Sequence, residues 1–215
     1  MSDIPVPDEH VHAAFLAAPG FMPEDEGLAL YAAAVEVAPL GPLVEIGSYC
    51  GRSTLLLAAA AATSGTHVVT VDHHRGSEEH QAGWEYHQPE LVDPTAGRID
   101  TLPTFRRVVA TSGLESHVVA VVAAAQDLGR YWSTPVAMVF VDGSHTEESA
   151  RRDYLTWSPH VMDGGFLAVH DVFEDPADGG QAPYHMYRRA LESGNFAEGG
   201  GCRSLRLLRR VAEHG

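Results

Sequence analysis

Short apolar runs along this chain alternate with longer segments whose apolar residues recur at helical spacing. The runs are bounded by Gly, Pro or charged side chains, a pattern typical of buried strands. Strands that alternate with helices predict the α/β class, with a mostly parallel sheet covered by helices on both faces. We expect the strands at residues 43–46, 67–72, 118–122, 136–142, 166–171 and 203–209. We expect the helices at residues 8–18, 24–38, 55–62, 102–112, 144–158 and 184–193.

Local signals set some of the boundaries between these elements. The pattern Ser144-His-Thr-Glu147 is typical of a capping box and predicts that a helix begins there. The pair Gly164-Gly165 predicts a break before the fifth strand, and the Gly-rich residues 199–201 predict a connection into the last one. We expect residues 1–40 to form a helical cap over the sheet edge or over the mouth of a ligand site.

Residues 73–100 lack any sustained period and carry several His, Trp and Tyr side chains. A loop of this length inside a compact domain is usually functional or disordered. We therefore expect this segment to be a lid or a substrate loop. The chain has 215 residues, 45% of them hydrophobic, which is enough for one well-packed domain and short for two. We expect a single domain over residues 1–215.

The turn at Gly47 and Gly51, between the strand at 43–46 and an alanine-rich helix, is the first candidate for chemistry. Glycine has no Cβ and reaches positive φ without strain, so a ligand can approach the backbone closely there. The spacing is G-x-x-x-G, whereas a dinucleotide site needs G-x-G-x-x-G for the pyrophosphate. The turn therefore favours a ligand without phosphate groups and disfavours a nicotinamide cofactor.

Charge and cysteine usage narrow the choice of partners. The formal net charge of -15 repels nucleic acid and anionic membrane surfaces. All 14 basic residues are arginine, so no lysine is present to form a Schiff base or to serve a P-loop. Cys50 and Cys202 show neither zinc-site nor disulfide spacing, and no apolar run is long enough to span a bilayer. We expect a soluble, cytoplasmic protein.

The segment Val44-Glu45-Ile-Gly47-Ser-Tyr-Cys-Gly51-Arg-Ser53-Thr resembles motif I of the class I S-adenosylmethionine-dependent methyltransferases. It is most similar to the small-molecule O-methyltransferase branch, which carries E-I-G-x-x-x-G-x-S. The resemblance covers roughly residues 24 to 210. It implies a Rossmann-like fold with a seven-stranded sheet whose last strand is antiparallel, and S-adenosylmethionine as cofactor.

The resemblance also implies which residues contact the cofactor. Glu45 and Gly47 would approach its methionine part, Asp72 would accept hydrogen bonds from the ribose hydroxyls, and Gln126 would lie near the adenine. Motif I has only two glycines here, which leaves the contacts of Ser48 and Tyr49 open. The full expected set is Glu45, Gly47, Ser48, Tyr49, Ser53, Asp72, His73, Gln126, Asp127 and Asp142.

Two further patterns, Asp142-Gly-Ser-His145 and His170-Asp171, end the fourth and fifth expected strands. They resemble the D-G-x-H and H-D signatures of a subfamily that includes antibiotic and sugar O-methyltransferases. The resemblance implies a divalent cation, expected to be Mg²⁺, at Asp142, His170 and Asp171. Carboxylates suit magnesium, whereas imidazole prefers zinc, nickel or iron. His170 is therefore either a metal ligand or a residue that orients a carboxylate or the substrate.

His145 is the expected general base, with Asp142 as the second catalytic residue. An imidazole titrates near pH 6.5 when unperturbed, which suits proton removal from an alcohol at neutral pH. The competing role for His145 is a structural one in the first turn of the helix that follows. The predicted activity is methyl transfer to a hydroxyl of a small molecule, expected to be a saccharide or a glycosylated compound, as in similar actinobacterial polysaccharide mannoside O-methyltransferases.

The expected partners are this acceptor and a second copy of the chain in a homodimer, with neither nucleic acid nor membrane. Four other interpretations stay open. One is a metal-independent methyltransferase with His145 as its sole base, and another is a nicotinamide-dependent oxidoreductase. The third is a metal-dependent hydrolase that uses His170-Asp171, and the fourth is a non-catalytic binding protein.

Overall fold

The computed structural model describes residues 5–81, 83–84, 86–143 and 146–211. Its α-helices are α1 (Glu9–Ala17), α2 (Glu24–Val37), α3 (Arg52–Thr63), α4 (Leu102–Ser112), α5 (Ala125–Gly129), α6 (Glu147–Trp157) and α7 (Ala182–Glu192). Its strands are β1 (Leu43–Ile46), β2 (Val68–Asp72), β3 (Val92–Asp93), β4 (Arg98–Ile99), β5 (Val118–Val122), β6 (Val136–Val141), β7 (Val161–Val169), β8 (Phe196–Cys202) and β9 (Leu205–Arg210). Short 3-10 helices are η1 (Ala38–Leu40), η2 (Glu78–His80), η3 (Pro89–Leu91), η4 (Glu115–His117) and η5 (Ser158–His160).

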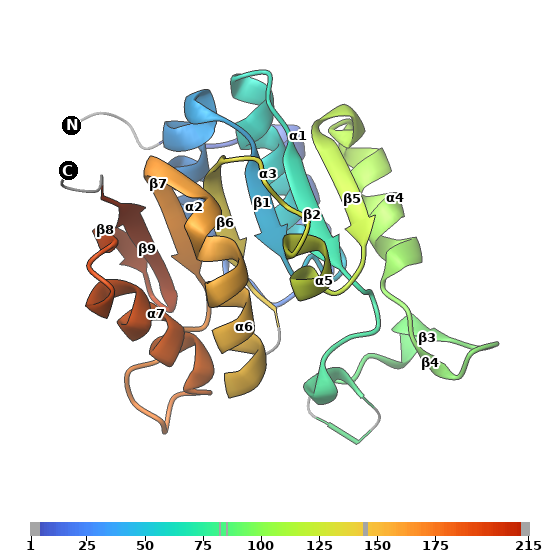
Figure 1. Ribbon diagram of the computed structural model, residues 1–215. Coiled ribbons are helices and arrows are strands. Elements are labelled where there is room, and N and C mark those ends of the chain that lie inside the picture. The colour runs from blue at the N-terminus through green and yellow to red at the C-terminus, as the bar shows by residue number, and fades with distance from the viewer. Residues whose placement is uncertain (1–4, 82, 85, 144–145, 212–215) are drawn as a thin grey trace.

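Seven strands form the main sheet in the order β5-β2-β1-β6-β7-β9-β8 (Figure 1). Neighbouring strands from β5 to β7 pair in parallel, while β9 pairs antiparallel with both β7 and β8. Only β9 therefore runs against the other six strands. The predicted mostly parallel, seven-stranded sheet with an antiparallel last strand is confirmed.

The register of the central strands brings their carboxyl ends to one level. Ile46 at the end of β1 pairs with Val71 on β2 and with Val141 on β6. The next residues, Gly47, Asp72 and Asp142, belong to sequence segments far apart but consequently lie at the same edge of the sheet. In a parallel α/β sheet this edge is where ligands bind.

Helices cover both faces of the sheet, as the sequence predicts (Figure 1). One apolar core joins one face of the sheet to α1, α2 and α3, and a second joins the opposite face to α6 and α7. Alternating strand residues serve the two cores: on β1, Leu43 belongs to the first and Val44 to the second. Close packing on the first face depends on Gly27 of α2, where a Cβ would lie 2.6 Å from the Phe15 ring and 2.9 Å from Leu56. A side chain there would push α1 and α3 away from α2.

The structure overturns three local predictions. The helix expected at Ser144 begins later, because the Thr146 side chain caps it by accepting the Ser149 N–H, and Ser144 lies outside the described residues. β7 runs through Gly164-Gly165 without ending, but its pairing with β6 shifts register there, between Val136–Val161 and Met138–Phe166. A Cβ on Gly165 would meet the Ala137 carbonyl oxygen at 2.5 Å, so glycine keeps β7 close to β6. The Gly-rich residues 199–201 belong to β8 rather than to a connection.

The segment 73–100 is not featureless, although the sequence shows no period there. It contains η2, η3 and a two-stranded hairpin of β3 and β4, in which Val92 pairs with Ile99. Figure 1 shows this segment beyond the carboxyl ends of the main strands and apart from the sheet. Its position is that of a cover over one end of the sheet, and its role as a lid stays a prediction.

The N-terminal helices form part of the helical layer on one face of the sheet, and α2 reaches the edge strand β8. α2 packs against α3 and over β6 to β9, and α1 packs against α3 and α4. The connection between α1 and α2 reaches the ligand end of the sheet, where residues 19–22 line a cavity. Within the described ranges, no helix is both long and apolar enough to cross a membrane.

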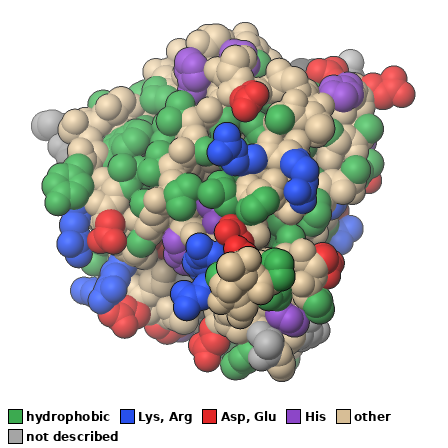
Figure 2. Space-filling model, turned by 90° about the vertical axis from the view of Figure 1, so that its right-hand side faces the viewer, with side chains coloured by type: hydrophobic (Ala, Val, Ile, Leu, Met, Phe, Trp, Pro, Cys, Tyr) green, Lys and Arg blue, Asp and Glu red, His purple; other side chains and the backbone are tan. Residues whose placement is uncertain are grey.

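The outer edge of the sheet at β5 is apolar. Val119 and Val122 are 46% and 56% exposed there. Figure 2 faces this side of the molecule and shows hydrophobic side chains gathered over it, with charged groups scattered among them. The burial of β5 thus differs from that of the central strands, whose apolar residues are covered on both faces.

Candidate functional site

Two adjoining cavities open at the carboxyl ends of the central strands. The first has a volume of about 400 Å³ and the second of about 530 Å³. Both are within the usual size range of small-molecule sites. The residues common to their walls are Gly47, Tyr49, His80, Asp142 and Gly143. The loops after β1 and β6 therefore stand between the two cavities.

Gly47 allows these two loops to meet. Its φ is +87°, and a Cβ at this position would lie 2.2 Å from the carbonyl oxygen of Asp142. Both the left-handed backbone and the lack of space therefore require glycine. The contact brings the Asp142 backbone against the first glycine loop, so the close approach at Gly47 is made by the chain itself.

Asp72 holds the same loop from the β2 side. Its Oδ2 accepts the backbone N–H groups of Ser48 at 3.0 Å and Tyr49 at 2.8 Å, and its Oδ1 accepts that of His74 at 2.6 Å. Asp72 also lines the first cavity, where the lone pair that remains on the carboxylate can accept a hydrogen bond from a ligand hydroxyl. The side chain is thus both a support of the loop and a candidate ribose contact.

Glu45 lies beneath the loop, and it lines neither cavity. Its carboxylate is completely buried and accepts hydrogen bonds from the hydroxyls of Ser53 at 2.5 Å, Thr54 at 2.6 Å and Thr70 at 2.7 Å. Burial raises its pKa to about 7, against the opposing effect of the three hydroxyls. The expected direct contact of Glu45 with the cofactor is therefore corrected: the side chain ties the first turn of α3 to β1 and β2. Ser53 borders the second cavity, but its hydroxyl is used by Glu45.

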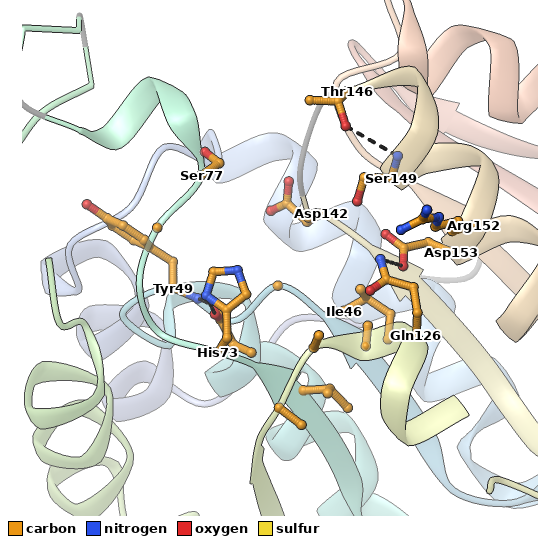
Figure 3. A pocket seen from close by; sticks show the side chains of 18 of the residues that line it. Ile46, Tyr49, His73, Ser77, Gln126, Asp142, Thr146, Ser149, Arg152 and Asp153 are labelled. Atoms are coloured by element: carbon orange, nitrogen blue, oxygen red, sulfur yellow. Dashed lines mark hydrogen bonds and ion pairs between the residues drawn. The ribbon is translucent and has the colours of Figure 1, made fainter. Parts of the chain in front are cut away.

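The far wall of the first cavity comes from α5 and α6. Gln126 lines it and donates from Nε2 to Oδ1 of Asp153 at 3.0 Å. Asp153 is buried, and burial raises its pKa to about 7, against the opposing hydrogen bonds from Gln126 and Ser149. Figure 3 shows Asp142 between this wall and the side of the cavity that carries His73. Gln126 and His73 therefore both line this cavity, and their contact with the cofactor stays a prediction.

Asp127 is not in either cavity. Its carboxylate is exposed on α5 and lies 3.9 Å from the Arg130 guanidinium. The adjacent Gln126 points inward because consecutive helical residues face about 100° apart, so only one of the pair can line the site. The expected cofactor contact of Asp127 is wrong for this reason.

Sequence reasoning missed four residues of α6 that line the first cavity: Glu148, Ser149, Arg152 and Asp153. Two pairs of them stand four residues apart, which places all four on one side of the helix. The signal that could have found them is this spacing in the helix that directly follows Asp142, since the helix after a strand end often supplies the wall of a site.

The second cavity contains Asp142, His170 and Asp171, the three expected metal ligands. One candidate ligand atom from each residue lies within 4.8 Å of the other two. His170 Nδ1 is 3.2 Å from Asp142 Oδ1 and 3.4 Å from Asp171 Oδ1. Two carboxylates and an imidazole nitrogen that converge in this way fit a divalent cation. The strand ends thus bring together side chains that are 28 residues apart in sequence.

His170 is buried among carboxylates. Its Nε2 lies 2.8 Å from Oε2 of Glu26, opposite the face that meets Asp142. Burial by itself lowers the pKa of His170, but Asp142, Asp171 and Glu26 outweigh it and raise this pKa far above its ordinary value. The surroundings therefore favour positive charge at this position, whether a proton or a metal ion carries it.

An aromatic wall closes the other side of the second cavity. The Tyr49 ring stacks on His80 with centroids 4.9 Å apart, and Phe21 contacts Tyr49 at 5.7 Å and Tyr86 at 5.1 Å. Phe21 comes from the connection before α2, and His80 and Tyr86 come from the segment 73–100. Arg52 holds the first of these connections, since its Nε donates to the Met22 carbonyl at 3.0 Å. The arrangement gives the cavity one aromatic side and one acidic side.

His145, the expected general base, lies outside the described residues. Its neighbours in sequence do line the site: Asp142, Gly143 and Thr146 all border the first cavity. The catalytic role of His145 accordingly stays a prediction.

The comparisons with known proteins agree with this geometry. A family model described as a methyltransferase domain matches residues 44–172, which include both strand-end patterns. Similar solved structures include the methyltransferase PaMTH1 of Podospora anserina with bound SAH, which is 15% identical, with a TM-score of 0.66 over 97% of this chain and 89% of that one.

Two O-methyltransferases show the same likeness. TomG of Streptomyces achromogenes, involved in tomaymycin synthesis and solved with SAM, is 19% identical, with a TM-score of 0.60 over 98% of this chain and 93% of that one. The Bacillus cereus enzyme, solved with SAH, is 16% identical, with a TM-score of 0.64 over 98% and 94%. At such identities these structures establish the fold, and the family match extends over more than half of the chain.

Proposed function

This chain belongs to the methyltransferase domain family, and on that premise we propose that it methylates a hydroxyl group of a small molecule with S-adenosylmethionine as donor. The observation that carries the proposal is the meeting of two cavities at Asp142. One is bounded by the glycine loop, Asp72 and Gln126; the other contains the Asp142, His170 and Asp171 cluster. The SAM- and SAH-bound O-methyltransferases of the same fold support the donor and the hydroxyl acceptor.

The first cavity is the proposed donor site. Gly47 and Asp72 both line this cavity, and the Asp72 carboxylate offers a lone pair to a ribose hydroxyl. S-adenosylmethionine carries its methyl group on a positively charged sulfur. When the acceptor oxygen takes the methyl group, S-adenosylhomocysteine is the leaving group. Asp142 stands between the two cavities, where its charge favours a cationic donor.

We propose a magnesium ion at Asp142, His170 and Asp171. Its chemistry there is to favour the deprotonated acceptor hydroxyl by positive charge. The chain's own part is to orient the acceptor and remove its proton, a step that we assign to His145 on the sequence pattern alone. The acceptor hydroxyl loses its proton to this base, and its oxygen attacks the methyl carbon as the bond from sulfur to that carbon breaks. The products are the methyl ether, S-adenosylhomocysteine and one proton.

A saccharide or another polyhydroxylated compound is the proposed acceptor. Neighbouring hydroxyls of such a molecule suit the acidic side of the second cavity, and the faces of sugar rings pack on aromatic side chains. Phe21, Tyr49 and Tyr86 provide such faces on the opposite wall. The cavity therefore combines the two surfaces that a sugar ring uses.

The test is a screen of sugars and glycosylated compounds with methyl-labelled S-adenosylmethionine, with and without EDTA. We expect transfer to a hydroxylated acceptor that EDTA abolishes and Mg²⁺ restores. Transfer that persists in EDTA would retire the metal part and leave a metal-independent methyltransferase. His145→Ala should lose turnover yet bind S-adenosylhomocysteine as the wild type does, and retained turnover would remove His145 as base. Calorimetry in which NAD binds and S-adenosylhomocysteine does not would instead favour the oxidoreductase alternative.

A further inference from the structure

Glu26, in the first turn of α2, is buried and uses both of its carboxylate oxygens. Oε1 accepts the backbone N–H of Ser204 at 2.6 Å and the Ser204 hydroxyl at 2.8 Å, in the turn between β8 and β9. Oε2 lies 2.8 Å from Nε2 of His170. Glu26 lines neither cavity, and the proposed reaction gives it no part. Burial on this scale is unusual for a glutamate, so the contact with His170 calls for a role.

The partners of Glu26 determine which ring nitrogen of His170 carries a proton. Oε1 of Glu26 accepts two hydrogen bonds from Ser204, and an ionised carboxylate only accepts hydrogen bonds. Nε2 must therefore donate its hydrogen to Glu26. The other nitrogen, Nδ1, faces Asp142 and Asp171 across 3.2 Å and 3.4 Å. A neutral imidazole with hydrogen on Nε2 has its lone pair on Nδ1, toward those two carboxylates.

We propose that Glu26 is a positioning residue for the divalent cation: it holds His170 as the Nε2–H tautomer, so that Nδ1 completes the ligand set with Asp142 and Asp171. The inference rests on the proposed function, since it takes the cation site from there. Metal-binding histidines commonly donate their second N–H to a carboxylate, which sets the ring orientation and raises the basicity of the ligand nitrogen. Here that carboxylate comes from a helix about 144 residues earlier in the chain.

Ser204 fixes the orientation of the Glu26 carboxylate. Its two donors occupy Oε1, so the Glu26 side chain cannot rotate without leaving two buried donors unsatisfied. The turn between β8 and β9 thus holds the carboxylate, the carboxylate holds the imidazole, and the imidazole presents Nδ1. These contacts predict how His170 responds when Glu26 is replaced by a residue of the same shape.

Glu26→Gln is that substitution. The amide has one acceptor oxygen and one donor nitrogen. Two donors from Ser204 draw the oxygen to their side, so the amide nitrogen faces His170 and donates to Nε2. His170 then carries its hydrogen on Nδ1, where it blocks the cation. We expect Glu26→Gln to weaken Mn²⁺ binding roughly 10- to 100-fold in calorimetry or electron paramagnetic resonance titration. Its affinity for S-adenosylhomocysteine, measured in the same preparation, should not change.

The control is Glu36→Gln, the same substitution on the same helix. Glu36 pairs with Arg209 at the surface, away from both cavities, and its loss should leave Mn²⁺ affinity unchanged. A second comparison uses His170→Asp, which puts a carboxylate oxygen near the place of Nδ1. A carboxylate has no tautomers, so Glu26→Gln should cause no further loss of Mn²⁺ affinity in that background. Such non-additivity would identify the imidazole as the route of the effect.

A measurement on the wild type covers the case in which Glu26→Gln fails to fold. Nitrogen-proton NMR of the histidine rings with Mg²⁺ bound should show His170 as the Nε2–H tautomer, assigned by the signal missing from His170→Asp. An Nδ1–H tautomer would overturn the proposal. So would a folded Glu26→Gln variant with wild-type Mn²⁺ affinity, and that result would leave the metal site intact. Wild-type enzyme that binds neither Mn²⁺ nor Mg²⁺ would overturn the metal site itself, and the role of Glu26 with it.

Discussion

The backbone N–H of Tyr49 donates to Oδ2 of Asp72 at 2.8 Å, and this bond joins the first glycine loop to the end of the neighbouring strand. Tyr49 has a φ of +46°, a conformation that residues with side chains seldom adopt. The same carboxylate oxygen also accepts the Ser48 N–H. The charge on Asp72 thus stabilises a loop conformation that the residues of the loop disfavour by themselves.

Asp72→Asn should loosen this loop. Hydrogen bonds to a charged group contribute about 1.5–3 kcal/mol and neutral ones about 0.5–1.5 kcal/mol, so we expect a loss of about 1–2 kcal/mol in the free energy of unfolding. Affinity for S-adenosylhomocysteine should fall as well. Urea denaturation and calorimetry measure the two effects. The control is Asp93→Asn, because Asp93 accepts two backbone N–H groups in an exposed turn away from the cavities. Undiminished S-adenosylhomocysteine binding by Asp72→Asn would contradict the dual role.

Gly47→Ala should be far more damaging than alanine at another glycine of similar φ. A left-handed backbone alone costs a residue with a Cβ about 1–2 kcal/mol. At Gly47 the new Cβ also meets the Asp142 carbonyl oxygen at 2.2 Å, whereas at Gly113, with φ +76°, it meets nothing within 4 Å. We expect Gly113→Ala to lose about 1–2 kcal/mol of stability and Gly47→Ala to lose more than about 4 kcal/mol or to fail to fold. Equal thermal shifts for the two variants would show that the close approach of the loops is not needed.

Glu45 should make stability depend on pH. Its pKa is raised from 4.5 to about 7 in the folded state, so the folded chain binds the proton more tightly than the unfolded chain between these values. Stability then falls as pH rises from about 4.5 to about 7 and levels off above, by up to about 3 kcal/mol.

Glu45→Gln tests this dependence, because the amide cannot ionise and the three surrounding hydroxyls can donate to it or accept from it. The free energy of unfolding of wild type and variant is measured by denaturation at pH 5 and at pH 8. Relative to the wild type, the variant should be more stable at pH 8 than it is at pH 5. Glu36→Gln, at the surface, should follow the wild type at both pH values. A constant difference between wild type and Glu45→Gln would refute the raised pKa.

Arg52→Met should release the connection between α1 and α2 from the site. The guanidinium donates to the carbonyl oxygens of Met22 at 3.0 Å and Ala18 at 3.0 Å, and it lies over the Phe15 ring at 4.6 Å. Methionine keeps the apolar stem but makes none of these hydrogen bonds. We expect faster hydrogen exchange at residues 18–22 and a loss of about 1–3 kcal/mol in stability. Arg107→Met, on the exposed side of α4, should change neither, and unchanged exchange at 18–22 in Arg52→Met would disprove the role of the arginine.

The order of strands and helices could be read from the sequence because apolar runs and helical spacing are local patterns. The boundaries that failed depended on distant contacts. Gly164 and Gly165 look like a break, but β7 continues through both. Gly164 has a φ of +78° with open space at its Cβ position, whereas a Cβ on Gly165 would collide with the Ala137 carbonyl oxygen of β6. Gln126 and Asp127 are adjacent polar residues, and the sequence predicts a site role for both. The orientation of α5 places only Gln126 in the wall of the first cavity.

The sequence by itself determined the residue types that the chemistry needs: a glycine turn without the dinucleotide spacing, and acids or histidine at the ends of apolar strands. The parallel sheet follows from the same local patterns. Only the tertiary structure decided that Glu45 is a buried support and that α6 supplies a wall of the first cavity. Only it showed that Glu26 meets His170. Hydrogen bonds between residues more than a hundred positions apart depend on strand order and helix packing, and no local spacing records them.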